Sequence, residues 1–542
     1  MKIKRIGVGL AAIAAASALA LTGCSNSSSG SGDTSSSAKA DPAAIVTTNG
    51  NEPQNPLIPG NTTEVGGGKI VTSIFEGLVS YNADGSTQDE VAKSITSSDN
   101  KVWDIKLNDG WKFTNGEAVT ADSFIDSWNL TANSANAYGG SYFLDNIEGF
   151  SYDKPVTALP GLKKVSDTEF TVTLSAPLAA WPLRLGYSAF YPMPKAAFTD
   201  LKAYGENPIG DGPYKVKSWT HNEQIELVTN PDYKGKRKPV NGGLTIKFYT
   251  SQDTAYADAQ SDDLDVLDAV PDSAFQTFES DFKGREVNQP AAIFQSITIP
   301  SYLPHFGEDE EGKLRRAAIS EAINRPQITK VIFNGTRTPA NDFTSPVIKG
   351  WSKDIPGSEV LKFNADDAKK KWAAADAISK YDGTFKIAYN ADGGHQTWVD
   401  AVSNSLKNTL GIKAEGQSYP DFPSLLKDED AHKMTGAFRS GWQADYPGLD
   451  DFLTPLYQTG AGSNYGQYSS KQVDDLFAQA AKASNEDDAN KLYQQAQSVL
   501  FQDLPAIPLW YSNEDGVWST KVSDVKFGWD SVPLYYAIKK SS

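Results

Sequence analysis

The chain of 542 residues has little chemistry of the kind that metals, disulfides and common hydrolases need. It contains one cysteine, Cys24, so it cannot form an internal disulfide, although exported proteins of this length can use them. Its four histidines show no metal-ligand spacing, so we expect no metal and no cofactor. Neither a Gly-x-Ser-x-Gly nor a His-Glu-x-x-His motif occurs, which disfavours the commonest secreted hydrolases.

Positive charge is also scarce. The chain has 50 Lys and Arg against 67 Asp and Glu, which gives a formal net charge of −17. An acidic surface argues against nucleic acid as a partner, because phosphate binding needs clustered cations. It favours solubility and tolerates cationic ligands.

The one long uncharged run lies at the N-terminus. Lys2, Lys4 and Arg5 precede an Ala-rich stretch at 6–21, which is too short for a comfortable membrane span and indicates a signal peptide at 1–23. The run ends in Leu-Thr-Gly-Cys, which resembles a bacterial lipobox and implies a diacylglyceryl anchor on Cys24. An ordinary free thiol at Cys24 is the alternative. Removal of the peptide would bring the net charge from −17 to −20.

Residues 24–40 are rich in Ser, with Gly, Asn and Asp and few apolar residues, and we expect a flexible tether there. The remaining chain is too long for one hydrophobic core, so it should contain at least two domains. Its pattern is mixed α/β. The expected strands are 44–48, 102–107, 169–174, 214–219, 225–228, 244–249 and the segment from 507, and the expected helices are 70–78, 120–128, 314–322, 327–333, 473–480 and 492–500.

Four segments along the chain resemble, in the same order, the extracellular solute-binding proteins that serve bacterial ABC importers of peptides, nickel and related solutes. They are Phe-Glu-Gly-Leu at 75–78, Trp-Lys-Phe-Thr-Asn-Gly-Glu-Ala-Val-Thr-Ala-Asp at 111–122, Gly-Asp-Gly-Pro-Tyr at 210–214, and the helix-like 314–325. The last segment normally ends in Asp-Arg, whereas this chain has Asn324, a departure that leaves its local capping open.

The resemblance implies an α/β fold of two hinged lobes, the periplasmic-binding-protein-like fold, with an extra subdomain in lobe one. We expect lobe one at 41–300 and 506–542, the inserted subdomain at about 69–205, and lobe two at 301–505. Lobes of this kind close over a ligand by hinge motion.

The resemblance also implies a function. We expect a lipid-anchored binding protein at the extracellular face of the cell membrane, monomeric and not an enzyme. It would capture oligopeptides in the cleft between the lobes and deliver them to ABC importer permease subunits, which work with cytoplasmic ATPases.

The segment 438–447 resembles the oligopeptide-binding branch of this family. Its Asp445 implies a counter-charge for the free amino end of a peptide, since a buried ammonium needs one. Capping of a turn before Pro447 is the alternative. Arg439 and Trp442 match positions that line the same pocket in that branch. In this chain Arg439 either meets a ligand carboxylate or forms a structural ion pair, and Trp442 either walls a side-chain pocket or packs in the core.

Two further residues complete the candidate site. Glu52 lies in the loop after the first strand, where related proteins reach the peptide, and Tyr142 is a loop aromatic that either reaches the cleft or is simply exposed. Recognition is expected mainly through the peptide backbone.

Three other readings stay open. An oligosaccharide or another small solute could replace the peptide, because 12 Trp, 23 Tyr and 24 Phe offer stacking surface. A secreted hydrolase with paired carboxylates is a distant alternative. An adhesin or signalling role could coexist with uptake.

Overall fold

The computed structural model describes residues 40–420 and 422–541. The predicted signal peptide, Cys24 and all but the last residue of the predicted tether lie outside the described residues. Within the two described ranges, no helix combines the length and the apolar composition that a bilayer crossing requires.

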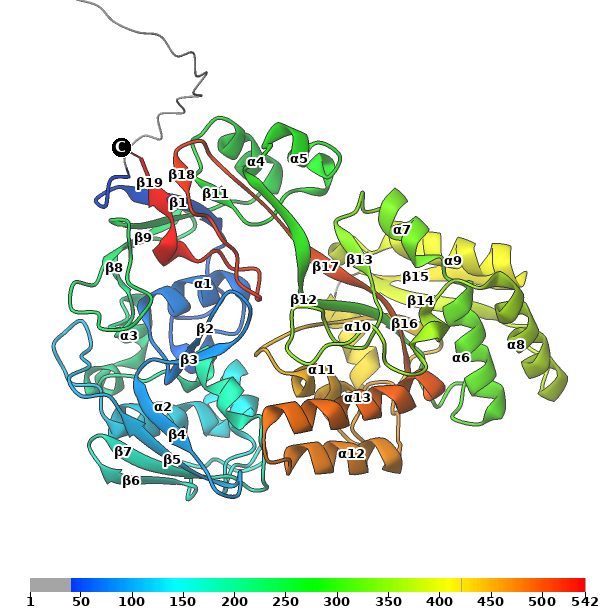
Figure 1. Ribbon diagram of the computed structural model, residues 1–542, viewed down its shortest axis with the longest axis horizontal. Helices are drawn as coiled ribbons and strands as arrows, with labels where there is room; N and C mark the ends of the chain where they lie inside the picture. Colours follow the sequence, from blue (N-terminus) through cyan, green and yellow to red (C-terminus); the bar gives the residue numbers. More distant parts are fainter. Residues whose placement is uncertain (1–39, 421, 542) are drawn as a thin grey trace, which may run out of the picture. The chain divides into compact units, whose positions relative to one another are not determined.

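One mixed sheet runs through the described body and connects its two lobes (Figure 1). Among the described residues it has eleven strands, in the order β15-β14-β16-β12-β17-β11-β1-β10-β9-β8, with β13 paired to β17. We call the β1, β8–β11 side lobe one and the β14–β16 side lobe two. The bounds are β1 Ile45–Gly50, β8 Tyr214–Thr220, β9 Gln224–Thr229, β10 Gly243–Phe248, β11 Val266–Leu267, β12 Glu286–Thr298, β13 Arg337–Pro339, β14 Thr384–Asn390, β15 Lys413–Tyr419, β16 Ala437–Gln443 and β17 Ala506–Trp518.

The two longest strands, β12 and β17, belong to both lobes. They pair antiparallel from Glu286 opposite Val517 to Thr298 opposite Ala506, with an interruption inside this range. Their register shifts between Pro290 and Phe294, a stretch that includes a proline without an N–H to donate. Beyond the shift β12 also pairs with β16, and β17 reaches β11 at its other end. The irregular stretch therefore lies between the two lobes, and the predicted domain boundaries near 300 and 505 stay predictions.

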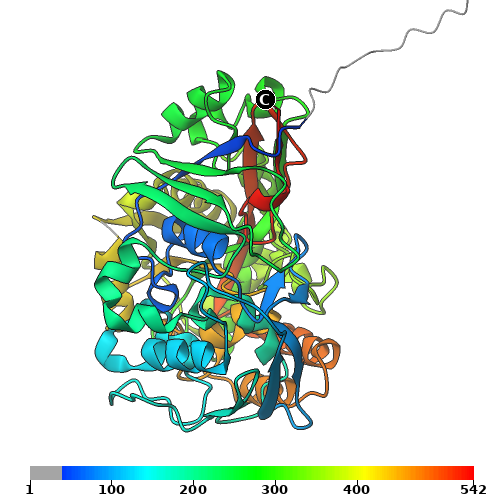
Figure 2. The ribbon, with the colours of Figure 1, turned by 90° about the vertical axis from the view of Figure 1, so that its left-hand side faces the viewer.

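Lobe one is built as the sequence indicates, with the predicted strands at 44–48, 214–219, 225–228 and 244–249 confirmed. β1 pairs in parallel with β10, and Ala40 forms an isolated bridge with Ser541, so the chain returns to this lobe at its end. Figure 2 shows the blue first strand beside the red C-terminal segment. The other elements here are α1 Val65–Ile74, α3 Leu201–Glu206, α4 Gln252–Gln260, α5 Phe278–Asp281, β2 Val79–Tyr81, β3 Thr87–Asp89, β18 Val522–Ser523 and β19 Lys539–Lys540.

The predicted helix at 70–78 is wrong at both ends, because α1 spans Val65–Ile74. It begins early, in spite of three glycines, since the Glu64 carboxylate accepts a hydrogen bond from the Gly67 N–H and caps the helix. It ends at Ile74, whose carbonyl accepts from the Gly212 N–H, while Asp211 accepts from the Glu76 N–H. The Gly-Asp-Gly segment at 210–212 thus forms hydrogen bonds with backbone groups that the next turn of α1 would need, so the helix stops at Ile74.

A separate small sheet packs against α2 in the region between β3 and α3. Its order is β4-β5-β7-β6, with β4 Ala92–Thr96, β5 Val102–Leu107, β6 Leu162–Ser166, β7 Glu169–Thr173 and α2 Ala121–Ala132. The predicted Thr120 cap is confirmed by a capping box with Ser123. Phe124 and Trp128 pack on Phe170 of β7, and all three side chains are fully buried.

Helices cover lobe two, and the predicted helices at 314–322, 473–480 and 492–500 lie in them. The predicted helix at 327–333 is wrong at its end, because the observed helix stops at Val331. Asn324, the residue that departs from the family pattern, caps α7 by accepting from the Gln327 N–H, so capping is preserved. The helices are α6 Glu310–Ala322, α7 Arg325–Val331, α8 Ala365–Ile378, α9 Gln396–Leu410, α10 Phe422–Asp430, α11 Leu449–Tyr457, α12 Lys471–Ala481 and α13 Glu486–Asp503.

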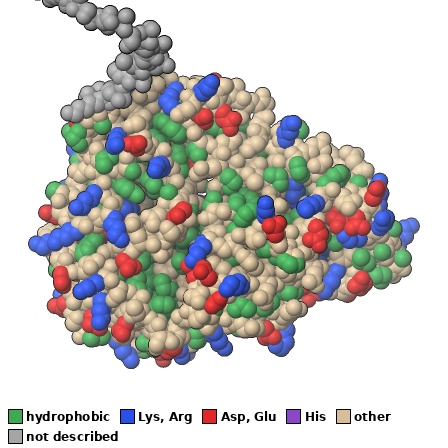
Figure 3. Space-filling model, in the orientation of Figure 1, with side chains coloured by type: hydrophobic (Ala, Val, Ile, Leu, Met, Phe, Trp, Pro, Cys, Tyr) green, Lys and Arg blue, Asp and Glu red, His purple; other side chains and the backbone are tan. Residues whose placement is uncertain are grey.

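Charged side chains of both signs are interspersed on the face drawn in Figure 3. The acidic excess of the sequence is thus spread over this face among basic groups. Such a surface favours solubility.

Two glycine substitutions test the account of α1. A Cβ at Gly210 would lie 1.8 Å from the Ile74 carbonyl oxygen, whereas a Cβ at Gly68, inside α1, meets nothing within 4 Å. We expect Gly210→Ala to destabilise the protein by about 2 kcal/mol or more, and Gly68→Ala to stabilise it by about 0.5–1 kcal/mol through lower chain entropy. Urea unfolding monitored by circular dichroism measures both, and equal effects would contradict this account.

Candidate ligand-binding site

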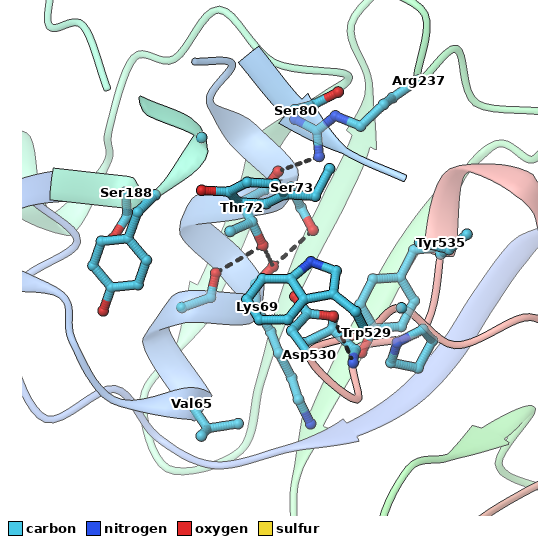
Figure 4. A pocket seen from close by; sticks show the side chains of 18 of the residues that line it. Val65, Lys69, Thr72, Ser73, Ser80, Ser188, Arg237, Trp529, Asp530 and Tyr535 are labelled. Atoms are coloured by element: carbon cyan, nitrogen blue, oxygen red, sulfur yellow. Dashed lines mark hydrogen bonds between the residues drawn. The ribbon is translucent and has the colours of Figure 1, made fainter. Parts of the chain in front are cut away.

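A cavity of about 340 Å³ lies where α1, the C-terminal segment 528–536 and the residues after β16 meet. Figure 4 shows Lys69, Thr72 and Ser73 on α1, with Trp529, Asp530 and Tyr535 on the C-terminal segment. Gln443, Ala444 and Asp445 line it from lobe two. A cavity of this size, with polar groups among aromatic walls, is typical of small-ligand sites.

Asp445 is held at the lobe-two wall by its neighbours on the sheet. The Ala444 N–H donates to the Ala292 carbonyl of β12 at 2.9 Å, which extends the β12–β16 pairing up to Asp445. The Asp445 carboxylate accepts a hydrogen bond of 2.9 Å from the hydroxyl of Tyr142, which lies in a 3-10 helix at Gly139–Leu144. The two predicted site residues Asp445 and Tyr142 are thus brought together, although Tyr142 is not among the described residues that line the cavity.

A second carboxylate lies directly behind Asp445. Asp451, near the start of α11, is buried and accepts from the Asp445 backbone N–H at 3.0 Å and from the Trp442 indole N–H at 3.1 Å. Asp451 therefore links the Trp442 side chain to the Asp445 backbone and holds that backbone in place. Trp442 is half-buried and packs at the edge of the lobe-two core, and it is not among the described residues that line the cavity.

These two carboxylates affect each other's titration. Burial raises the pKa of the Asp445 carboxyl to about 6, against the opposing effects of the Tyr142 hydrogen bond and the charge of Arg184. Burial, together with the charge of Asp445, raises the pKa of Asp451 well above its ordinary value. A cation placed at Asp445 would favour the charged form of both.

Arg184 approaches this region from lobe one but pairs elsewhere. Its guanidinium stacks 4.8 Å from the centre of the Tyr446 ring and lies 3.4 Å from the Asp450 carboxylate. Tyr446 donates to that same carboxylate at 2.8 Å. No ion pair joins Asp445 to a cation among the residues that the structure describes.

The other two predicted residues lie away from this cavity. The Arg439 Nε donates to the Asn390 side-chain oxygen at 2.8 Å, and its guanidinium lies over the Phe422 ring, within lobe two. The Glu52 carboxylate accepts from the Asn222 N–H at 2.8 Å and lies 2.7 Å from His221 Nδ1. It therefore stabilises the turn between β8 and β9. Neither residue is among the described residues of the cavity wall.

Sequence reasoning missed most of the lobe-one wall. Lys69 forms a buried ion pair with Asp268, Arg237 pairs with Glu76 at 3.0 Å, and the C-terminal segment adds Trp529, Asp530 and Tyr535. The only sequence signal was the cluster of aromatics after residue 528, and aromatics are common throughout this chain.

Comparison with known proteins identifies the family to which this chain belongs. The model of the "Bacterial extracellular solute-binding proteins, family 5 Middle" matches residues 87–464. The chain is 28% identical over 502 residues to the periplasmic oligopeptide-binding protein OppA of Salmonella typhimurium, covering 87% of this chain and 88% of OppA. It is 26% identical over 489 residues to the probable deoxycholate-binding periplasmic protein YgiS of Escherichia coli, covering 87% and 88%.

Solved structures agree on the fold. The unliganded open form of the periplasmic murein tripeptide-binding protein MppA superimposes with a TM-score of 0.80 at 22% identity, covering 93% of this chain and 98% of MppA. The predicted α/β fold of two lobes is thereby confirmed. This chain belongs to family 5 of the bacterial extracellular solute-binding proteins.

Proposed function

We propose that this protein captures oligopeptides in the cavity between its lobes, with the free amino end of the peptide at Asp445, and delivers them to the permease of an ABC importer. The observation that carries the proposal is Asp445, which lines the cavity and whose carboxylate has a neutral tyrosine hydroxyl as its side-chain partner among the described residues. A buried ammonium needs such a counter-charge.

The surroundings of Asp445 suit an extended peptide. Gln443, at the end of β16, lines the cavity, where a strand backbone can pair with a peptide backbone regardless of its sequence. Family membership supports a role with an importer, and the similarity to the oligopeptide-binding protein OppA supports a peptide as the ligand.

The residue types of the cavity wall fit a protein that binds its ligand without converting it. None of the described residues that line it is a histidine or a cysteine, so its serine and threonine hydroxyls have no adjacent base of the usual kind. The relatives are solute-binding proteins, which further supports a protein that is not an enzyme.

A non-peptide solute is the second candidate, supported by the name of YgiS and by the aromatic wall of Tyr81, Tyr187 and Trp529. Native mass spectrometry of gently purified protein separates the two, because a retained ligand would show the mass of a peptide or of another solute.

We further propose attachment to the extracellular face of the membrane through a lipid on Cys24. The proposal rests on the lipobox-like sequence alone.

Replacement of Asp445 tests the amine contact. Asp445→Ala should weaken binding of free-amine tripeptides about 10- to 100-fold, since a charge-assisted contact worth about 1.5–3 kcal/mol is lost. The N-acetylated forms of the same peptides serve as the control and should lose little. Equal losses for both, measured by isothermal titration calorimetry, would contradict the assignment.

Binding should depend on pH with a defined sign. The empty site holds Asp445 with a pKa of about 6, and a bound ammonium favours the carboxylate. Full affinity is therefore expected above pH 6, with a loss of up to about tenfold for each pH unit below it and with proton release on binding there. Calorimetry in two buffers of different ionisation enthalpy measures that proton, and an N-acetylated peptide should show no such release.

The anchor has its own test. Cys24→Ser should release the protein into the medium without changing the peptide affinity of the folded body. Cell fractionation with immunoblotting measures the location, and continued membrane attachment of the variant would overturn the lipid assignment.

A further inference from the structure

The C-terminal wall of the cavity holds a second carboxylate, Asp530, in a turn built to present it. The Asp530 Oδ1 accepts from the Val532 N–H at 3.2 Å, and the Gly528 N–H donates to the Val532 carbonyl at 2.8 Å. Figure 4 shows Asp530 between Trp529 and Tyr535, across from α1. Like Asp445, it forms no ion pair with any described residue.

The cations of the cavity wall are already neutralised. Lys69 and its partner Asp268 have 7% and 4% of their side chains exposed, so this pair is closed to solvent. Arg237 donates to the Glu76 carboxylate and to the carbonyls of Thr72 and Phe75, each at 3.0 Å. Neither cation forms an ion pair with Asp445 or Asp530.

The third acidic residue of the wall is occupied as well. The Glu64 carboxylate accepts from the Gly67 N–H and from the Gln54 N–H at 3.1 Å, and so faces the start of α1. Both Glu64 oxygens thus accept from backbone N–H groups, whereas the Asp445 and Asp530 carboxylates each accept a single hydrogen bond from another described residue. One ammonium can balance one of them.

The walls around Asp530 suit the stem of a long basic side chain. Trp529 is buried and meets the Tyr81 ring edge-on at 5.4 Å between centroids, and Tyr535 closes the same side of the cavity. Aromatic faces attract cations and pack well against the methylene groups of Lys and Arg.

We propose that Asp530 and Trp529 form a subsite for a cationic side chain, so that this protein prefers peptides with Lys or Arg near the free amino end. This inference rests on the proposed peptide-binding function and adds a substrate class to it. Burial raises the pKa of Asp530 to about 6, although the charges of Arg237 and Lys69 oppose the rise. A bound cation would relieve that cost.

The test uses the purified full chain and six tripeptides with free amino ends. Three carry Lys at position 1, 2 or 3 of an otherwise all-Ala sequence, and three carry norleucine, an uncharged side chain of similar length, at the same positions. Calorimetry at pH 7.5 should show Lys bound about tenfold more tightly than norleucine at position 1 or 2, the gain expected from one charge-assisted contact.

Asp530→Asn should erase that preference and leave the norleucine peptides within about twofold of wild type. The amide keeps an oxygen to accept from the Val532 N–H, and a thermal melt checks that the variant is folded. Asp524→Asn is the matched control, because it removes the same charge from an exposed residue that lies just before the C-terminal segment and pairs with Lys539. It should keep the preference for Lys.

The outcomes separate the two proposals. No preference at any position, a preference that survives Asp530→Asn, or an equal loss for Lys and norleucine peptides would overturn the subsite while the peptide-binding function stands. If none of the free-amine peptides binds, or if Asp445→Ala leaves all of them unaffected, the proposed function fails first and the subsite fails with it.

Discussion

The pairing of β12 with β17 is the interaction on which the rest of the structure depends. Both strands run through both lobes, and their ladder is irregular only between Pro290 and Phe294 and beside Ser296. β16, which carries the lobe-two wall of the cavity, is attached to this pair through β12. The position of Asp445 relative to the α1 wall therefore depends on this ladder.

Charge in the cavity follows a simple rule of burial. Cations that line the wall are paired with carboxylates behind it, as in Lys69–Asp268 and Arg237–Glu76, while Asp445 and Asp530 are left with neutral donors. Because an isolated buried charge is costly, this arrangement is complementary to a positively charged guest. The acidic excess of the whole chain did not reveal it, because that excess is spread over the surface.

Sequence patterns predicted the elements well where the determinants are local. The alternation in β5 and β7 and the Thr120 cap of α2 depend on neighbours in the chain. The start of α1 was missed because Glu64 compensates for three glycines, and its end because Gly212 arrives from far along the chain. Asp445 was predicted through a family motif, whereas Asp530 reaches the cavity only through tertiary folding. Tertiary folding also places Arg439 and Glu52 outside the cavity wall, which the sequence alone could not show.

The buried carboxyl group of Asp451 affects which substitutions the protein can accept. A deeply buried carboxyl group that anchors Trp442 and the Asp445 backbone lowers the stability of the empty protein, since burial disfavours its charged form and no ion pair with a described residue offsets that cost. Substitutions that replace it should be easy to find in a selection for heat resistance, and they would loosen the geometry that orients Asp445. Thermal robustness and ligand capture therefore pull this position in opposite directions.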